Sequence, residues 1–344
     1  MVVISISAPA QKSTITIWKK NAIGALWNQE TATVAYGKAD AKGYYKIFLS
    51  DSLGNNERQV SFPAWLADRH QMPQEWDPTG QYLFCYVEKN EYSKEKGHKR
   101  KPVDAIPGYG AYTDLWLLKR DGSMAWQLTN LPNNYNSGII HGGISRDGKL
   151  FAWTERIGAP NMFKRGLGAG SYVFKVADFK FDTVPTLTNI RSFQPGGIPA
   201  SGELESISKD DSTLAFYSTF EKTTLFSTPI YTINMITGKI TRLTTESFAQ
   251  CPTYTPDGKS IVYMTGQQCD IFPFEVQGAD WWIMNTDGSN KKRLTFMNKR
   301  NHAQSVNHYR LAGTLSFINN HSFFGDVMTK PLGLIGQIVK VVFE

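Results

Sequence analysis

The chain has 344 residues and a formal net charge of +7, from 37 basic and 30 acidic side chains. Aromatic residues make up 13% and charged residues only 19% of it, with 29 Gly and 16 Pro, a mixture typical of many short strands joined by turns. No apolar run approaches the roughly 20 residues that cross a bilayer, so no transmembrane helix is expected. Three Cys are too few for a disulfide framework.

The chain is built from recurring β-hairpins with alternating apolar positions. First hairpins lie at residues 75–88, 141–155, 205–218 and 251–264, and second hairpins at residues 114–130, 230–245 and 280–296. Turns such as Asp257-Gly258 and Asp287-Gly288 join their strands, because Gly adopts positive φ without a Cβ clash. The final strands end in Leu-Thr at residues 128–129, 187–188, 243–244 and 294–295, and this spacing of about 50 to 60 residues is near the period of propeller blades.

Weaker copies of the repeat open and close the chain, so the sequence predicts an all-β, six-bladed β-propeller. We place the blades at residues 21–62, 63–131, 132–190, 191–246, 247–297 and 298–344. Each blade is an antiparallel sheet of four strands, here named a to d from the channel outward.

The N-terminal residues are strand-like and lack the basic and apolar regions of a signal peptide. Because the last blade is one strand short, we expect residues 2–18 to complete it, so that the N-terminal strand closes the ring and leaves no unpaired edges. A disordered leader is the alternative.

The repeats PTYTPDGKSIVYM, HGGISRDGKLFAW and DGSNKKRLT resemble those of the TolB-type (WD40-like) β-propeller family, over nearly the whole chain. The resemblance implies the fold. It does not select a function, because the family and its relatives include periplasmic accessory proteins, propeller domains of serine peptidases and oligogalacturonate lyases. Some family members have an additional N-terminal domain, whereas we expect no second domain ahead of the propeller in this sequence.

Long connections are predicted on one face of the propeller. The a–b and c–d turns share the opposite face, whereas the b–c connections at residues 89–113, 157–171, 219–229 and 265–279 are long, as binding loops often are. The basic run at residues 94–101 has no interleaved aromatic residues for base stacking, so we expect a solvated loop tip and no specific nucleic-acid partner. Tyr109 and Tyr112 are candidates for stacking on a ligand such as a sugar ring, or for covering the propeller edge.

Polar side chains are expected around the mouth of the central channel, where the innermost strands bring Glu75, His141, Glu205, Cys251 and His302. Imidazole nitrogens and carboxylate oxygens are common metal ligands. His141 and His302 are therefore candidate ligands for a divalent cation such as Ca²⁺ or Mn²⁺, and solvated polar walls are the alternative.

Enzymatic activity is the less favoured interpretation. No G-x-S-x-G nucleophile elbow occurs, so no peptidase domain is predicted. Oligogalacturonate lyases resemble the chain in fold, but their Q-x-x-H-x-H metal cluster has no copy here. The nearest residues are His302, Gln304 and His308, which share one side if the segment is a regular strand.

Two of the three cysteines are predicted to lie on the loop face. Cys251 opens an innermost strand and Cys269 lies in the following b–c connection, so a disulfide between them would indicate an oxidising compartment. Cys85 is interpreted as a small core residue.

These observations favour a binding or assembly module that engages a protein or polysaccharide partner through the b–c face. The resemblance implies a periplasmic or secreted protein whose leader peptide is outside this numbering, and the sequence also permits a cytoplasmic one. A metal-dependent lyase- or hydrolase-like enzyme acting at the channel mouth is the first alternative. A structural subunit of a larger assembly is the second, and the sequence leaves the oligomeric state open.

Overall fold

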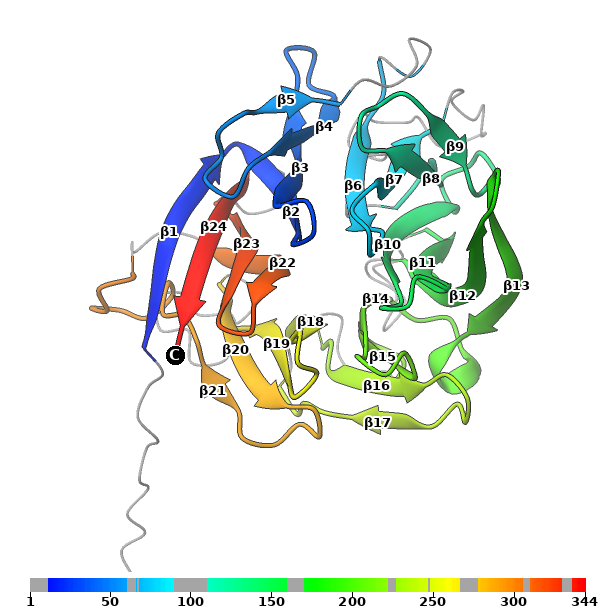
Figure 1. Ribbon diagram of the computed structural model, residues 1–344. Helices are drawn as coiled ribbons and strands as arrows, with labels where there is room; N and C mark the ends of the chain where they lie inside the picture. The colour runs from blue at the N-terminus through cyan, green and yellow to red at the C-terminus, as the bar shows by residue number, and fades with distance from the viewer. Residues whose placement is uncertain are drawn as a thin grey trace, which may run out of the picture.

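A computed structural model describes residues 12–60, 66, 68–89, 110–159, 170–221, 227–246, 248–266, 278–305, 310–329 and 336–344. These residues form six separate antiparallel sheets of four strands each, arranged in a ring (Figure 1). The predicted all-β, six-bladed β-propeller is therefore confirmed. The described part of the chain contains no helix long and apolar enough to cross a bilayer.

Each blade uses four strands, and in five blades they follow one another along the chain. Blade 1 contains β2 (Ala22–Asn28), β3 (Thr33–Ala39), β4 (Tyr45–Ser50) and β5 (Arg58–Gln59). Blade 2 contains β6 (Gln71–Trp76), β7 (Tyr82–Glu88), β8 (Thr113–Lys119) and β9 (Ala125–Gln127). Blade 3 contains β10 (Gly138–Ile144), β11 (Leu150–Gly158), β12 (Ser171–Phe181) and β13 (Pro185–Phe193), followed by the 3-10 turn η3 (Pro195–Gly197).

The other three blades complete the ring. Blade 4 contains β14 (Gly202–Ile207), β15 (Thr213–Ser218), β16 (Ile230–Asn234) and β17 (Ile240–Arg242). Blade 5 contains β18 (Ala249–Tyr254), β19 (Ser260–Thr265), β20 (Asp280–Asn285) and β21 (Lys292–Arg293). Blade 6 combines β22 (Leu311–Asn319), β23 (Ser322–Met328) and β24 (Gly336–Phe343) with the N-terminal strand β1 (Ser13–Lys20).

The N-terminal strand closes the ring as predicted. In Figure 1, β1 lies beside β24, and the two strands pair in antiparallel register from Ser13 opposite Phe343 to Lys20 opposite Gln337. Trp18 ties this outer strand to blade 1, because its indole N–H donates to the Ser52 carbonyl at 2.9 Å. The segment ahead of residue 12 lies outside the described residues.

The core lies between the blades. Each pair of neighbouring blades shares one buried apolar cluster, so the six clusters form a ring around the channel. Between blades 2 and 3, for example, Phe84 and Phe151 stack with ring centroids 4.2 Å apart. Burial of such side chains stabilises by about 1.5–3 kcal/mol each, which makes the inter-blade contacts the main source of stability.

The Leu-Thr motif has a structural role. The hydroxyls of Thr129 and Thr295 donate to the carboxylates of Asp114 and Asp280, at 3.0 and 2.8 Å, at the start of strand c of the same blade. Asp280 also contacts the buried Arg293 guanidinium at 2.8 Å, in a network that fastens the end of the blade. In blade 3 the motif lies within a longer β13 and does not end the strand.

All six innermost strands are interrupted near their middle. Each departs from regular register with its neighbour, as a β-bulge does. The interruptions lie between Ile23 and Leu26, Pro73 and Glu75, Ile139 and Gly142, Leu204 and Ser206, Gln250 and Thr253, and Ala312 and Leu315. Bulges re-aim side chains and occur often next to functional sites.

Candidate functional site

The bulged strands surround a central cavity of about 460 Å³. Its lining includes the four carboxylates Glu75, Glu203, Glu205 and Asp326, and the imidazole of His141. Among the described residues that line it there is no Lys or Arg. The centre of this net basic chain is therefore acidic.

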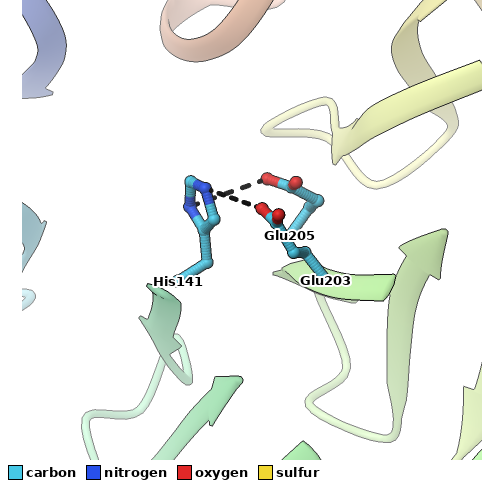
Figure 2. A group of neighbouring side chains, drawn as sticks. All are labelled: His141, Glu203 and Glu205. Atoms are coloured by element: carbon cyan, nitrogen blue, oxygen red, sulfur yellow. Dashed lines mark ion pairs between the residues drawn. The ribbon is translucent and has the colours of Figure 1, made fainter. Parts of the chain in front are cut away.

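His141, Glu203 and Glu205 form the densest part of this lining. Figure 2 shows the two carboxyl groups, both from β14, directed at the imidazole from β10. His141 Nε2 lies 3.0 Å from Glu203 Oε2, and His141 Nδ1 lies 3.9 Å from Glu205 Oε2. One donor atom from each residue can be chosen so that all three lie within 4.8 Å of one another.

Bulges position this cluster. His141 lies in the bulge of β10, and Glu205 is the extra residue between the register pairs Leu204–Phe216 and Ser206–Ala215. The two strands belong to neighbouring blades, which are joined where the Leu204 N–H donates to Thr154 Oγ1 at 2.8 Å. The backbone therefore brings the three functional groups together.

Burial and neighbouring charges act in opposite directions on each pKa of the cluster, and both His141 and Glu205 end with a raised pKa. Burial disfavours a charged imidazole, but the Glu205 and Glu203 carboxylates outweigh it and raise the pKa of His141 to about 9. Burial raises the pKa of Glu205 to about 7, although His141 opposes the change. Strongly shifted pKa values of this kind are a property of many functional sites.

Glu205 is the most enclosed member of the cluster. Its side chain is 4% exposed, against 20% for His141 and 17% for Glu203. Within the described part of the chain, Glu205 Oε1 has no hydrogen-bond partner. Nearby Cys251 interacts with this carboxyl group and adopts a φ of 53° at the bulge of β18, a conformation that non-glycine residues rarely take.

Glu75 and Asp326 contribute two further carboxyl groups to the cavity. Glu75 accepts the Trp76 backbone N–H at 2.9 Å, and burial raises the pKa of Glu75 to about 7. Asp326 accepts the Gly24 N–H at 2.8 Å, and burial raises its pKa to about 6. Its second oxygen, Oδ1, has no hydrogen-bond partner among the described residues.

The structure places His141, Glu75, Glu205 and Cys251 at the cavity, where the sequence put them. The prediction for His302 and Gln304 is wrong. The innermost strand of blade 6 begins only at Leu311, and both residues precede it.

His302 and Gln304 lie at the outer side of the ring instead. The imidazole of His302 stacks on Phe296, with ring centroids 4.4 Å apart. Gln304 donates to the Ser13 carbonyl at 2.9 Å, and Ser13 belongs to the outermost strand of blade 6. Neither residue can share a metal ion with His141.

The structure also locates some of the other residues that the sequence singled out. Tyr112 is buried against Tyr135, with its ring centroid 6.3 Å away, so it is not a free stacking platform. Cys251 is a free thiol. Tyr109, Cys269 and His308 lie outside the described residues, as do most residues of the four long b–c connections.

Sequence reasoning missed Glu203 and Asp326. Glu203 lies two residues before Glu205, so strand alternation could have placed both carboxylates on one side. Asp326 had no such signal, because it lies on the second strand of blade 6, opposite the bulge of β22.

No protein-family model matches the chain, and no curated protein matches it in sequence. Solved structures are similar in fold. TolB from Acinetobacter baumannii matches with a TM-score of 0.52 at 14% identity, over 91% of this chain and 64% of that one. The chain is also similar to a puromycin-hydrolyzing peptidase of Mycobacterium tuberculosis, with a TM-score of 0.55 at 11% identity, over 93% of this chain and 42% of that one.

Prolyl oligopeptidase B from Galerina marginata gives a TM-score of 0.52 at 11% identity, over 93% of this chain and 42% of that one. The chain thus spans less than two thirds of the TolB structure and less than half of either peptidase. These similarities show a TolB-like β-propeller fold, and at such identities they show the fold alone.

Proposed function

We propose that this TolB-like β-propeller is a binding module whose central cavity receives a positively charged group of a protein partner. The acidic lining carries the proposal. Four carboxylates and one imidazole face a cavity without a described Lys or Arg, in a chain of net charge +7. A cavity lined by one sign of charge concentrates ligands of the opposite sign.

The size of the cavity defines what part of a partner enters. A volume of about 460 Å³ is typical of small-ligand pockets and holds a Lys or Arg side chain, or a chain terminus. Acidic polysaccharides are disfavoured there because they would meet like charges. We therefore favour a protein partner over a polysaccharide, with the b–c face as the surface that surrounds the inserted group.

A location outside the cytoplasm, in the periplasm or secreted, is part of the proposal. It is supported by the resemblance of the repeats to TolB-type propellers, which include periplasmic accessory proteins.

The test is calorimetric titration with short peptides that differ only in charge. Lys peptides are compared with norleucine peptides, and Arg peptides with citrulline peptides. We expect the charged peptides to bind at least about tenfold more tightly than their neutral counterparts, since charged hydrogen-bonded pairs contribute about 1.5–3 kcal/mol. The preference should fall in Glu75→Gln and persist in Glu30→Gln, whose side chain is exposed on a turn. Equal binding of charged and neutral peptides, or no binding of either, would refute the proposal.

A metal-dependent lyase- or hydrolase-like enzyme is the second candidate. The cluster of His141, Glu203 and Glu205 favours it, because it offers ligands for a metal within the cavity. Turnover that disappears on chelation and returns with added metal would support this candidate over a pure binding module.

A further inference from the structure

The binding of a positive partner group does not by itself explain why the His141 imidazole lies against two of the cavity carboxylates, those of Glu203 and Glu205. We infer that His141, Glu203 and Glu205 form a site for a first-row divalent metal ion, of which Mn²⁺ and Zn²⁺ are the test cases. This inference rests on the proposed function in one respect, because both place a positively charged group in the same cavity.

The distances fit a common ion. Donor atoms that each lie about 2.0–2.3 Å from one metal ion are roughly 3–4.5 Å from one another. One donor from each residue lies within 4.8 Å of the others, and His141 Nε2 is 3.0 Å from Glu203 Oε2. Small side-chain rotations are therefore enough to bring the three donors around one ion.

The backbone holds the donors in place before an ion binds. His141 and Glu205 sit in bulges of strands from neighbouring blades, and Glu203 lies on the same strand as Glu205. Ligands mounted on rigid strands lose little conformational freedom on binding.

A second, independent observation supports a ligand beside Glu205. The Glu205 side chain is 4% exposed, its carboxyl group faces the cluster in Figure 2, and Oε1 has no hydrogen-bond partner among the described residues. A buried carboxylate oxygen without a partner is destabilising. A metal ion next to Glu205 would supply the missing interaction.

The donor types select the metal. Ca²⁺ and Mg²⁺ prefer oxygen ligands throughout, whereas one imidazole and two carboxylates suit Mn²⁺ or Zn²⁺. Three protein ligands leave coordination positions open to the cavity. A divalent ion also balances the charges of Glu203 and Glu205, which leaves Glu75 and Asp326 to face the positive group of a partner.

The opposing interpretation is that a protonated His141 serves only as the counter-ion of the two carboxylates. The two interpretations differ in stoichiometry and in their response to substitution. A counter-ion needs no metal, and the folded protein would then remain metal-free in the presence of micromolar Mn²⁺ or Zn²⁺.

The experiment uses the full chain, stripped with a chelator and dialysed. Binding of Mn²⁺ is followed by electron paramagnetic resonance and binding of Zn²⁺ by calorimetry, with Ca²⁺ for comparison. We expect one ion per chain, and an affinity at least about 100-fold weaker in Glu203→Gln or His141→Gln, since even indirect partners of a metal ligand change affinity by about 10–100-fold. Glu203→Asp should recover part of the affinity, and Glu30→Gln should bind as the parent does.

Circular dichroism and urea unfolding establish that each variant is folded. Absence of stoichiometric binding in the parent, unchanged binding in folded Glu203→Gln, or tighter binding of Ca²⁺ than of both test metals would each overturn the inference. If metal fails to bind while the Lys and Arg peptides keep their advantage, the metal site is refuted and the proposed function stands. If metal binds with the expected ligand dependence while the peptides show no charge preference, the metal site stands and the proposed function is refuted.

Discussion

Replacing Glu75 by Gln should stabilise the fold, although it alters the proposed binding site. Glu75 keeps its one backbone contact in the variant, because a Gln Oε1 accepts the Trp76 N–H as the carboxylate does at 2.9 Å. The substitution therefore removes charge and little else.

The magnitude follows from the pKa. Burial raises the pKa of Glu75 from its ordinary value of 4.5 to about 7. The folded protein thus binds the proton more tightly than the unfolded chain, so stability is lost as pH rises from about 4.5 to 7 and is constant above. At about 1.4 kcal/mol for each pH unit, this loss is roughly 3 kcal/mol. Water in the cavity screens the charge of Glu75 and makes the loss smaller.

Urea unfolding followed by Trp fluorescence measures this effect at pH 4.5 and pH 8. We expect Glu75→Gln to match the parent at pH 4.5 and to exceed it by about 2–3 kcal/mol at pH 8. Glu30→Gln, with an exposed side chain, should follow the parent at both pH values. A variant less stable than the parent at pH 8, or equally stabilised at both pH values, would show that the charge of Glu75 is not the cause.

Three further outcomes follow from the same structure. Asp280→Ala should lower the free energy of unfolding by about 3–5 kcal/mol in urea titrations, because it removes the carboxylate that faces the buried Arg293. A loss below about 1 kcal/mol would contradict a stabilising role for this ion pair. The Glu205 and Glu203 carboxylates outweigh burial and raise the pKa of His141 to about 9, so the stability of the metal-free protein should fall between pH 6.5 and 9 as His141 loses its proton. Thermal melts of His141→Gln should lack this fall. Deletion of residues 1–20 exposes the edge of β24 and should produce self-association in size-exclusion chromatography, whereas a stable monomer would show that ring closure by β1 is dispensable.

The fold was predictable because its signals are local. Turn glycines such as Gly258 and Gly288 adopt φ values of 75° and 84°, as the Asp-Gly motifs require. Alternating apolar positions define strands that bury both faces between blades. The Leu-Thr motif gave the period of the repeat, but its cause was hidden, because the Asp114 and Asp280 carboxylates that bind the threonines lie 15 residues away in the chain.

The site was predictable only in part. His141, Glu75 and Glu205 could be placed because each lies in an innermost strand. His302 and Gln304 could not be placed correctly, because turns held by local hydrogen bonds replace the expected strand there. The His302 N–H donates to the Lys299 carbonyl at 3.3 Å, and Gln304 accepts the Phe296 N–H at 2.8 Å.

Propeller geometry explains why alternation alone cannot identify channel residues. Both faces of a blade pack against neighbouring blades, so the side chains of a regular innermost strand point into the inter-blade core, and only the strand edge faces the channel. An extra residue breaks this arrangement and turns a side chain toward the axis. His141, Glu205 and Cys251 occupy such positions, which is why polar groups can gather in the cavity while Leu204 remains in the core. The positions of the bulges, which are set by pairing between strands and not by local sequence, therefore help to decide which residues of this chain face the cavity. Regularly paired residues beside a bulge, such as Glu203, face it as well.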